Sequence, residues 1–160
     1  MAGIYLHIPF CKHRCAYCGF FSSTNQEWKD AYVSALCREL EMRKEYVGGE
    51  PIHTIYVGGG TPSQLSLSDL ERLFSYIYKV YKVSSDAEVT LEVNPDDVRD
   101  EYTSALRSSL PICRLSMGVQ TFNDERLRFL KRRHTAAQAF EAVDCCRRYG
   151  FTNLSIDLIY

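Results

Sequence analysis

The sequence predicts an α/β fold, a partial parallel (β/α) barrel with about five strands, and three observations support this prediction. Apolar runs of strand length recur at 4–8, 54–57, 88–93, 114–119 and 154–159. Longer segments with helical periodicity separate these runs. Turns rich in glycine, proline or polar residues follow the strands, as at 58–62 and 94–95. This alternation favours parallel strands with right-handed crossovers, and the turns after such strands form the functional rim of a barrel.

The first two helices are predicted by apolar stripes at intervals of three and four residues. The first helix spans 28–46, and its stripe consists of Trp28, Ala31, Tyr32, Ala35, Leu36 and Leu40. The second spans 67–81, with the stripe Leu67, Leu70, Phe74, Ile77, Tyr78 and Tyr81. Ser68 and Glu71 match a capping box at its start. We expect both stripes, including Trp28 and the tyrosines, to pack in the core.

Three more helices complete the predicted alternation. A short one follows Pro95, and two others cover 124–130 and 136–149, the last of them ended by Gly150. The chain stops directly after its most apolar strand, 154–159. A parallel strand with no neighbour beyond it would expose an edge that is prone to pairing. We therefore expect 1–160 to be the N-terminal part of one core domain, truncated at the C-terminus, with the remainder of the barrel and any C-terminal domain absent.

Composition and charge argue against several classes of function. The chain has 160 residues, of which 46% are hydrophobic and 24% charged, an ordinary globular composition. Nineteen basic and 20 acidic residues give a net charge of −1, and the densest basic run, 131–133, fits a solvated helix end. This balance predicts no nucleic-acid partner. We see no signal peptide and no transmembrane segment, which favours a cytoplasmic location.

Three closely spaced cysteines carry the strongest chemical signal. Cys11, Cys15 and Cys18 lie at spacings of four and three in the loop after the first strand. Soft thiolates at one centre select an iron–sulfur cluster, zinc or copper(I). Clusters ordinarily take four cysteines, but no fourth follows nearby, since position 20 is Phe20. A cluster at this loop would therefore keep one iron open for a substrate.

Two alternatives to a cluster remain open for these cysteines. Zinc bound by the three cysteines plus His13 or His7 is the main alternative. Packing alone fits the loop less well, because it also holds Lys12 and Arg14, cations that would stabilise thiolates and a net-negative cluster. The chain has seven cysteines without a secretion signal, which indicates reduced thiols. The remaining four are predicted to pack within helices or a strand: Cys37, Cys113, Cys145 and Cys146.

The loop Cys-x3-Cys-x2-Cys, with Tyr17 before the third cysteine, resembles the radical S-adenosylmethionine (SAM) superfamily. The fuller string at 5–11, Tyr-Leu-His-Ile-Pro-Phe-Cys, is similar to the branch of oxygen-independent coproporphyrinogen III dehydrogenases and heme chaperones of the HemW type. The resemblance implies a radical SAM barrel and a [4Fe–4S] cluster on Cys11, Cys15 and Cys18. It also implies that the open iron binds S-adenosyl-L-methionine, whose reductive cleavage yields a 5′-deoxyadenosyl radical.

The same resemblance assigns cofactor contacts after the second and third strands. Gly59, Gly60 and Thr61 match the superfamily's glycine motif, which binds the methionyl amino group; read alone, the glycine run is a tight turn. Glu92 resembles the glutamate that accepts bonds from SAM. Strand alternation places it opposite its apolar neighbours, so the barrel interior and an outward, solvated position are the two alternatives.

Four further contacts are implied later in the chain and on the first strand. Gln120 resembles a residue that binds ribose hydroxyls, and Asp157 another ribose or adenosine contact; a buried strand aspartate without function would be costly. Arg132 resembles the arginine near the methionyl carboxylate, with helix-surface charge as an equal alternative. Tyr5 resembles a residue that contacts cofactor or substrate, and a core tyrosine is its alternative.

Two features separate chaperone from enzyme within the branch. The dehydrogenases resembled carry a further cysteine two residues past the third, where this chain has Phe20, and an extension before the motif that begins here at Tyr5. Both differences favour a heme chaperone, with heme or porphyrin as cargo, heme-requiring client proteins, and a one-electron donor such as a flavodoxin or ferredoxin. The alternative is a coproporphyrinogen III dehydrogenase, and related radical methyltransferases remain a further alternative.

Overall fold

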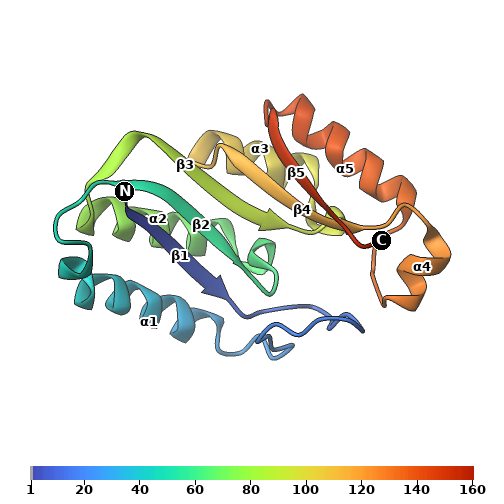
Figure 1. The fold of residues 1–160 in the computed structure, drawn as a ribbon, viewed down its shortest axis with the longest axis horizontal. Coiled ribbons are helices and arrows are strands. Elements are labelled where there is room, and N and C mark those ends of the chain that lie inside the picture. The colour runs from blue at the N-terminus through green and yellow to red at the C-terminus, as the bar shows by residue number, and fades with distance from the viewer. Residues whose placement is uncertain (1) are drawn as a thin grey trace.

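The computed structural model describes residues 2–160 and contains five parallel strands in one sheet, in the order β1-β2-β3-β4-β5. The strands are β1 (Ala2–Ile8), β2 (Ile52–Gly59), β3 (Val83–Val93), β4 (Arg114–Gln120) and β5 (Asn153–Leu158). Figure 1 shows all five arrows pointing toward the same end of the molecule, where the loop after β1 and the helix α4 lie. The predicted parallel α/β arrangement is confirmed.

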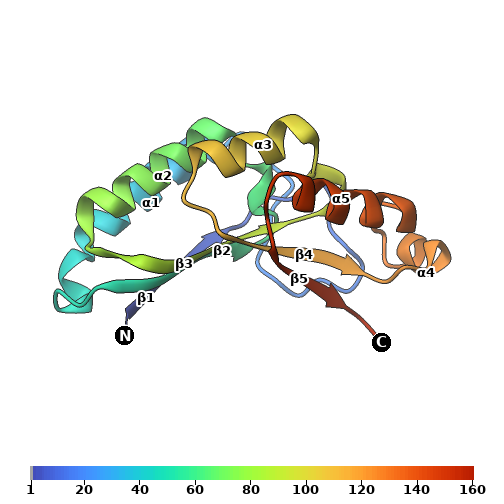
Figure 2. The ribbon, with the colours of Figure 1, turned by 90° about the horizontal axis from the view of Figure 1, so that it is seen from above.

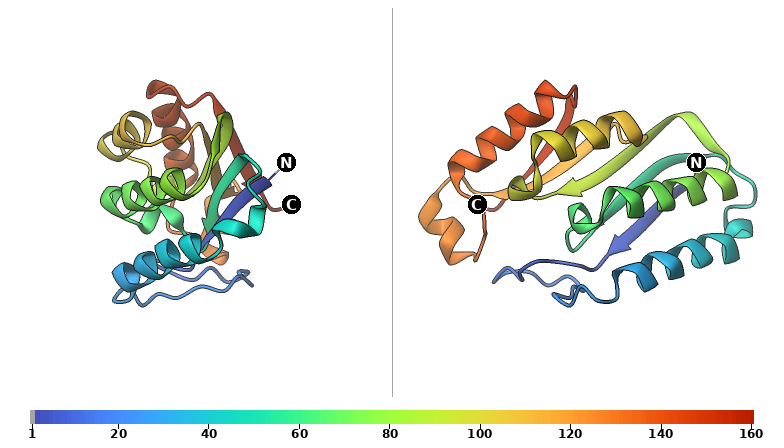
Figure 3. Two further views of the ribbon diagram at one scale, coloured as in Figure 1. Left: turned by 90° about the vertical axis from the view of Figure 1, so that its left-hand side faces the viewer. Right: turned by 180° about the vertical axis from the view of Figure 1, so that it is seen from behind.

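The helices connect successive strands as right-handed crossovers require. They are α1 (Lys29–Met42), α2 (Leu67–Val80), α3 (Asp100–Ser109), α4 (Asp124–Phe129) and α5 (Ala136–Arg148). Three short 3₁₀ turns, η1 (Lys44–Val47), η2 (Pro62–Gln64) and η3 (Pro95–Asp97), extend these connections. Figure 2 shows the helices on one side of the sheet, and the end-on view in Figure 3 shows the other side without them.

The core lies between the helices and one face of the sheet. Ile55 on β2 and Leu91 on β3 are fully buried there, and Ile77 of α2 packs in the same cluster. Alternate residues of each strand point to the opposite face. That face is polar around Tyr56 and Glu92. Both residues are half-buried, and the Tyr56 hydroxyl donates a hydrogen bond to the Glu92 carboxylate. Because of this alternation, polar side chains lie on the face of the sheet that the helices do not cover, and the apolar core on the other face is undisturbed.

The first helix differs from its prediction. It begins at Lys29, so Trp28 precedes it with its side chain 66% exposed, and the core prediction for this residue is wrong. The buried residues are Val33, Leu36, Cys37 and Leu40. The prediction is correct for Leu36 and Leu40 and wrong for Ala31 and Ala35, which are exposed, because a small alanine side chain is compatible with either face of a helix.

The second helix lies where it was predicted, but its N-terminal capping residues and its buried residues differ from the prediction. It begins at Leu67, so the capping box is formed by Ser66 and Asp69, two residues before the predicted pair. Leu73 is buried, whereas Tyr78 lies at the rim with 47% of its surface exposed. A tyrosine can cover apolar surface while its hydroxyl stays in water, so its presence in a stripe does not decide burial.

The last strand pairs with β4 on one side only. Its apolar side chains Ile156 and Leu158 remain 42% and 53% exposed. Among residues 2–160, no helix combines the length and the apolar character needed to cross a membrane.

Candidate functional site

The turns at the carboxyl ends of the strands surround a pocket of about 420 Å³. The loop after β1 contributes Cys11, Cys15 and Cys18 to it. The ends of the later strands and the segment after α4 contribute Gly59, Gly60, Thr61, Glu92, Gln120, Arg132 and Asp157. The structure therefore brings together residues from separate segments that the sequence predicted one by one. Parallel strands make this possible because all their carboxyl ends meet at one edge.

Backbone hydrogen bonds hold the cysteine loop in place. The amide of Cys11 donates to the carbonyl of Ser23 (2.9 Å), and the amide of Ser23 donates back to the carbonyl of Pro9 (2.7 Å). The far end of the loop is tied to the end of α4, since the amide of Ala16 donates to the carbonyl of Leu130 (3.1 Å). Cys11 is consequently buried, whereas Cys15 and Cys18 are half-exposed toward the pocket.

The chemistry of the loop's donors fits an iron–sulfur cluster, since its three candidate ligands are soft thiols. Within residues 2–160, no three His, Cys, Asp or Glu side chains are arranged to hold a single ion. Two of the three sulfurs already accept hydrogen bonds, Cys15 from Arg132 Nη1 (3.4 Å) and Cys11 from the Thr61 hydroxyl (3.5 Å). Such donors stabilise thiolate charge.

The zinc alternative receives no support from the histidines. His7 uses both ring nitrogens, Nδ1 with the Tyr5 hydroxyl (3.1 Å) and Nε2 with the Phe21 carbonyl (2.9 Å). His13 lines the pocket but joins no ion-binding group in the described part of the chain. The ring of His7 instead supports the far side of the cysteine loop through Phe21.

The glycines at the end of β2, Gly59 and Gly60, are required because other atoms approach their backbone closely. Gly59 has a φ of 113°, and a Cβ there would lie 2.5 Å from the His7 ring. A Cβ on Gly60 would lie 2.9 Å from the Ile8 carbonyl oxygen and 3.0 Å from the Cys11 sulfur. The turn therefore presents bare backbone against the cysteine loop, and the next residue, Thr61, is buried with its hydroxyl on Cys11. The glycine run therefore forms a tight turn and also leaves backbone accessible for close contact, so the two interpretations of this run are compatible.

Glu92 points into the pocket, not outward to solvent. Its Oε1 accepts from the Tyr56 hydroxyl (2.8 Å) and its Oε2 from the Gly59 amide (2.9 Å). Burial, together with the hydrogen bond and charge of Glu92, raises the pKa of Tyr56 to about 12. Tyr56 thus remains a neutral donor at physiological pH, and Glu92 joins two strands at the centre of the site.

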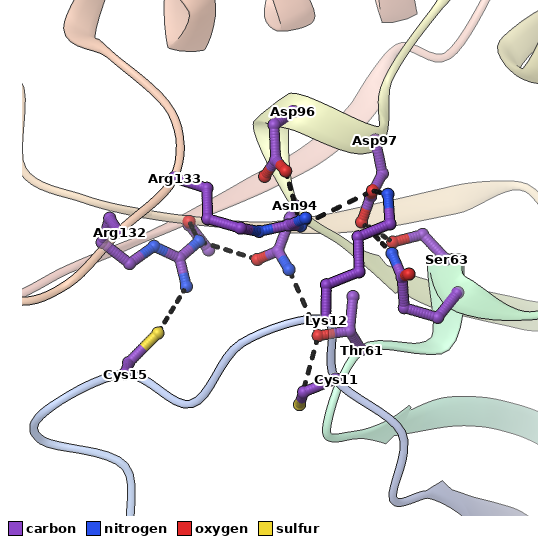
Figure 4. Close-up of polar contacts among 12 residues, drawn as sticks. Cys11, Lys12, Cys15, Thr61, Ser63, Asn94, Asp96, Asp97, Arg132 and Arg133 are labelled. Carbon is purple, nitrogen blue, oxygen red and sulfur yellow. Dashed lines mark hydrogen bonds and ion pairs between the residues drawn. The ribbon is translucent and has the colours of Figure 1, made fainter. Parts of the chain in front are cut away.

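Arg132 is more than helix-surface charge. Its Nη2 donates to the Asn94 side-chain oxygen (2.7 Å) and to the carbonyl of Gly118, while Nη1 reaches Cys15. The Nε atom is buried without a partner among the described residues. Figure 4 shows this guanidinium between the cysteine loop and the turn after β3. A fork of donors at this place is suited to hold a carboxylate or a thiolate.

Gln120 and Asp157 close the pocket from β4 and β5. Gln120 has a φ of 71°, a left-handed conformation that is uncommon for a residue other than glycine and that ends the strand with a sharp turn. Asp157 lies beside Gly118 in the sheet register and lines the pocket. Within residues 2–160 this aspartate is exposed and not buried as expected, since β5 pairs there with β4 alone.

Tyr5 lies apart from the other predicted residues. It is 57% exposed on β1, so the alternative of a core tyrosine is wrong. Its ring lies 6.1 Å from the ring of Tyr56, which does line the pocket, but Tyr5 itself borders a second cavity between β1 and α1. The structure places it on the same face of the sheet and outside the lining of the first pocket.

Sequence reasoning missed three residues that organise the site. Tyr56 alternates with apolar neighbours on β2 and could have been found from that pattern. Asn94 and Asp97 follow β3, where polar residues mark the rim. Asp97 is buried and accepts hydrogen bonds from Lys12 (2.9 Å) and Ser63 (2.8 Å), which ties the cysteine loop to the turns after β2 and β3 (Figure 4). No local sequence pattern predicts the contacts of Asp97, because its partners lie far from it in sequence.

The family assignment comes from a match to the radical SAM superfamily over residues 5–160. The chain belongs to the radical SAM superfamily. Within it, the chain is 42% identical to the heme chaperone HemW of Lactococcus lactis over 98% of its length and 40% of that protein. It is 36% identical to the oxygen-independent coproporphyrinogen III oxidase of Escherichia coli, over 98% of the chain and 35% of that protein.

Solved structures place this radical SAM chain in the same branch. The coproporphyrinogen III oxidase HemN of Escherichia coli, described as a radical SAM enzyme, superposes with a TM-score of 0.90 at 36% identity, over 99% of the chain and 37% of that structure. The cobalamin-dependent radical SAM enzyme OxsB shares the fold, with a TM-score of 0.64 at 16% identity over 98% of the chain and 24% of that structure. The chain spans about 40% of the length of the curated relatives it matches.

Proposed function

We propose that the chain is the N-terminal part of the radical SAM core of a HemW-type heme chaperone. The intact protein would bind a [4Fe–4S] cluster and S-adenosyl-L-methionine at the pocket formed by the strand ends, and heme for transfer to client proteins. A protein named for that function in Lactococcus lactis is 42% identical to the chain. We further propose a cytoplasmic location and a one-electron donor such as a flavodoxin or ferredoxin.

The cluster would be held by Cys11, Cys15 and Cys18, whose thiols line one pocket. When bound, the cluster and SAM supply one-electron reduction and radical chemistry. Arg132 would hold the methionyl carboxylate, because its guanidinium fork faces the pocket with a buried Nε that has no protein partner among residues 2–160. Gly59 and Gly60 would bring bare backbone against the ligand.

The remaining contacts would orient the nucleoside half of SAM. Gln120 and Asp157 line the pocket from neighbouring strands and offer an amide and a carboxylate to ribose hydroxyls. Glu92, with the backbone at Gly59 and the hydroxyl of Tyr56, supplies fixed polar groups at the centre. Tyr5, outside this lining, would contact cargo or a larger ligand over the open face of the sheet.

Phe20 is the observation that carries the chaperone proposal. It lines the pocket with 64% of its surface exposed, at the position where the dehydrogenases that the sequence resembles have a further cysteine. A thiol at this place could bind metal or take part in redox chemistry, whereas a phenyl ring offers only apolar contact. An exposed aromatic beside the cluster loop suits contact with a flat apolar ligand such as a porphyrin.

The second candidate is an oxygen-independent coproporphyrinogen III dehydrogenase. The superposition on the Escherichia coli enzyme, with a TM-score of 0.90, favours it. Both candidates require the same cluster and the same SAM pocket. They differ in whether coproporphyrinogen III is turned over, so the experiment measures consumption of this substrate.

The test uses the intact protein, reconstituted anaerobically with iron and sulfide. We expect about four irons per chain, a change in the EPR spectrum of the reduced cluster when SAM is added, and loss of the cluster when Cys15 is replaced by Ser. Heme titration should give saturable binding, and coproporphyrinogen III should remain unconsumed. Turnover to protoporphyrinogen IX would transfer the assignment to the dehydrogenase. One zinc without sulfide would refute both.

A further inference from the structure

Asn94, the first residue after β3, lies at the centre of a hydrogen-bond chain between two cysteine sulfurs. Its Nδ2 donates to Thr61 Oγ1 (3.2 Å), and the Thr61 hydroxyl donates to Cys11 Sγ (3.5 Å). Its Oδ1 accepts from Arg132 Nη2 (2.7 Å), and Arg132 Nη1 donates to Cys15 Sγ (3.4 Å). Figure 4 shows both arms meeting at Asn94.

The direction of every bond in this chain follows from Arg132. A guanidinium has donors only, so the atom of Asn94 that faces it must be the oxygen. The NH2 group of Asn94 is then turned toward Thr61, whose oxygen accepts. Because a lone pair of that hydroxyl is occupied by Asn94, its proton is directed to the sulfur of Cys11. One amide therefore orients the donors to both thiols, although it touches neither sulfur.

The surroundings hold Asn94 in this role. Pro95 follows it and is buried in the turn η3, which fixes the backbone at the end of β3. Thr61 is buried, with 6% of its surface exposed, so the arm to Cys11 is screened from water. Arg132 is kept in place from the other side by the Gly118 carbonyl. The donors thus keep their direction without help from solvent.

We propose that Asn94 is a positioning residue that sets the reduction potential of the cluster through Thr61 and Arg132. This inference rests on the proposed function, since it requires the cluster on these cysteines. Hydrogen bonds donated to cysteine ligands stabilise the more negatively charged, reduced form of an iron–sulfur cluster and raise its potential. Removal of Asn94 frees the Thr61 hydroxyl and leaves the Nη2 atom of Arg132 held by the Gly118 carbonyl alone, so both donors to the sulfurs are weakened and the potential becomes more negative.

The experiment is an anaerobic redox titration of the reconstituted intact protein, without SAM, followed by EPR. Asn94→Leu keeps the size of the side chain and removes both bonds. We expect at least a tenfold fall in the ratio of reduced to oxidised cluster at a fixed potential, which is about 59 mV for a one-electron couple. Asn153→Leu is the matched control, since Asn153 lies at the start of β5, at the opposite end of the sheet from the cysteine loop. The reduction potential of the cluster in this variant should equal that of wild type.

A second variant tests whether Asn94 acts through Thr61. Thr61→Val removes only the hydroxyl that reaches Cys11, so it should lower the potential by a smaller amount than Asn94→Leu. In the double variant Asn94→Leu/Thr61→Val the two shifts in potential should not add. The Asn94 substitution alone already leaves the Thr61 hydroxyl without the partner that orients it, so removing that hydroxyl has little further effect. Full additivity would overturn the proposal, and so would an unchanged potential in Asn94→Leu.

Failure of the variant to fold and failure of the cluster to bind give different results. If Asn94→Leu does not fold, as judged by circular dichroism, Asn94→Ser removes the same bridge with a smaller polar side chain and should reproduce the shift; a wild-type potential in that variant overturns the inference. If wild-type protein takes up no cluster, the proposed function fails. If wild type takes up the cluster and only the variant potentials stay unchanged, the role of Asn94 alone fails.

Discussion

Substitution of Gly60 by alanine tests how tightly the glycine turn is packed against the cysteine loop. A Cβ at this position would lie 2.9 Å from both the Ile8 carbonyl oxygen and the Pro9 carbonyl carbon, and 3.0 Å from the Cys11 sulfur. The first two atoms are backbone and cannot rotate away. The amide of Gly60 also donates to the Ile8 oxygen at 2.8 Å, so retreat of the turn would stretch that bond.

The magnitude follows from these contacts. Overpacking against a well-packed core costs about 1–3 kcal/mol, and a weakened backbone hydrogen bond adds about 0.5–1.5 kcal/mol. We therefore expect Gly60→Ala to lower the free energy of unfolding by about 2–4 kcal/mol. The melting temperature of the variant should therefore be lower than that of wild type. Because the displaced atoms lead directly into Cys11, reconstituted iron content should fall as well.

The assay is thermal unfolding of the intact protein by circular dichroism, with iron and sulfide analysis after reconstitution. Gly19→Ala is the matched control, since Gly19 lies in the cysteine loop and a Cβ there meets nothing within 4 Å. It should stay within about 0.5 kcal/mol of wild type. A Gly60→Ala protein with the melting temperature and iron content of wild type would refute the reasoning.

Three further expectations can be measured in the same intact protein. Glu92→Gln leaves one of two donors without an acceptor, so the free energy of unfolding should fall by about 1–3 kcal/mol, and the pKa of Tyr56, raised to about 12 by burial and by Glu92, should move down in a spectroscopic titration. Asp97→Asn removes the buried carboxylate that pairs with Lys12 of the cysteine loop and should cost about 1–3 kcal/mol in urea unfolding, since the cations left behind are partly exposed; Asp86→Asn, at an exposed carboxylate, should cost far less. Burial first, and then the charge of the neighbouring arginine, lowers the pKa of His134. The unfolded chain therefore holds this proton more tightly, so stability should decline below about pH 6.5 in wild type and decline less in His134→Phe.

Local sequence determined the type of fold and predicted several of the side chains that line the pocket. The alternation of apolar runs and helical stripes depends only on residues near in sequence, and it correctly predicted parallel strands and the helices between them. Strand alternation at Glu92 correctly predicted a side chain opposite the core, because the period of a strand is independent of its neighbours. The spacing of Cys11, Cys15 and Cys18 confined three thiols to one loop and hence to one side of the pocket.

Tertiary structure decided everything that depends on two loops meeting. Trp28 matched a helical stripe, but the helix begins one residue later and leaves it exposed, since only the packing of the helix on the sheet decides which residues are covered. Asp157 matched a buried strand position, but its exposure depends on which strands pair with β5, and within residues 2–160 only β4 does so. Asn94 and Asp97 showed no motif, and they gain their roles from the sheet register that brings the ends of β1, β2 and β3 together. Such contacts link residues far apart in sequence, so no local pattern encodes them.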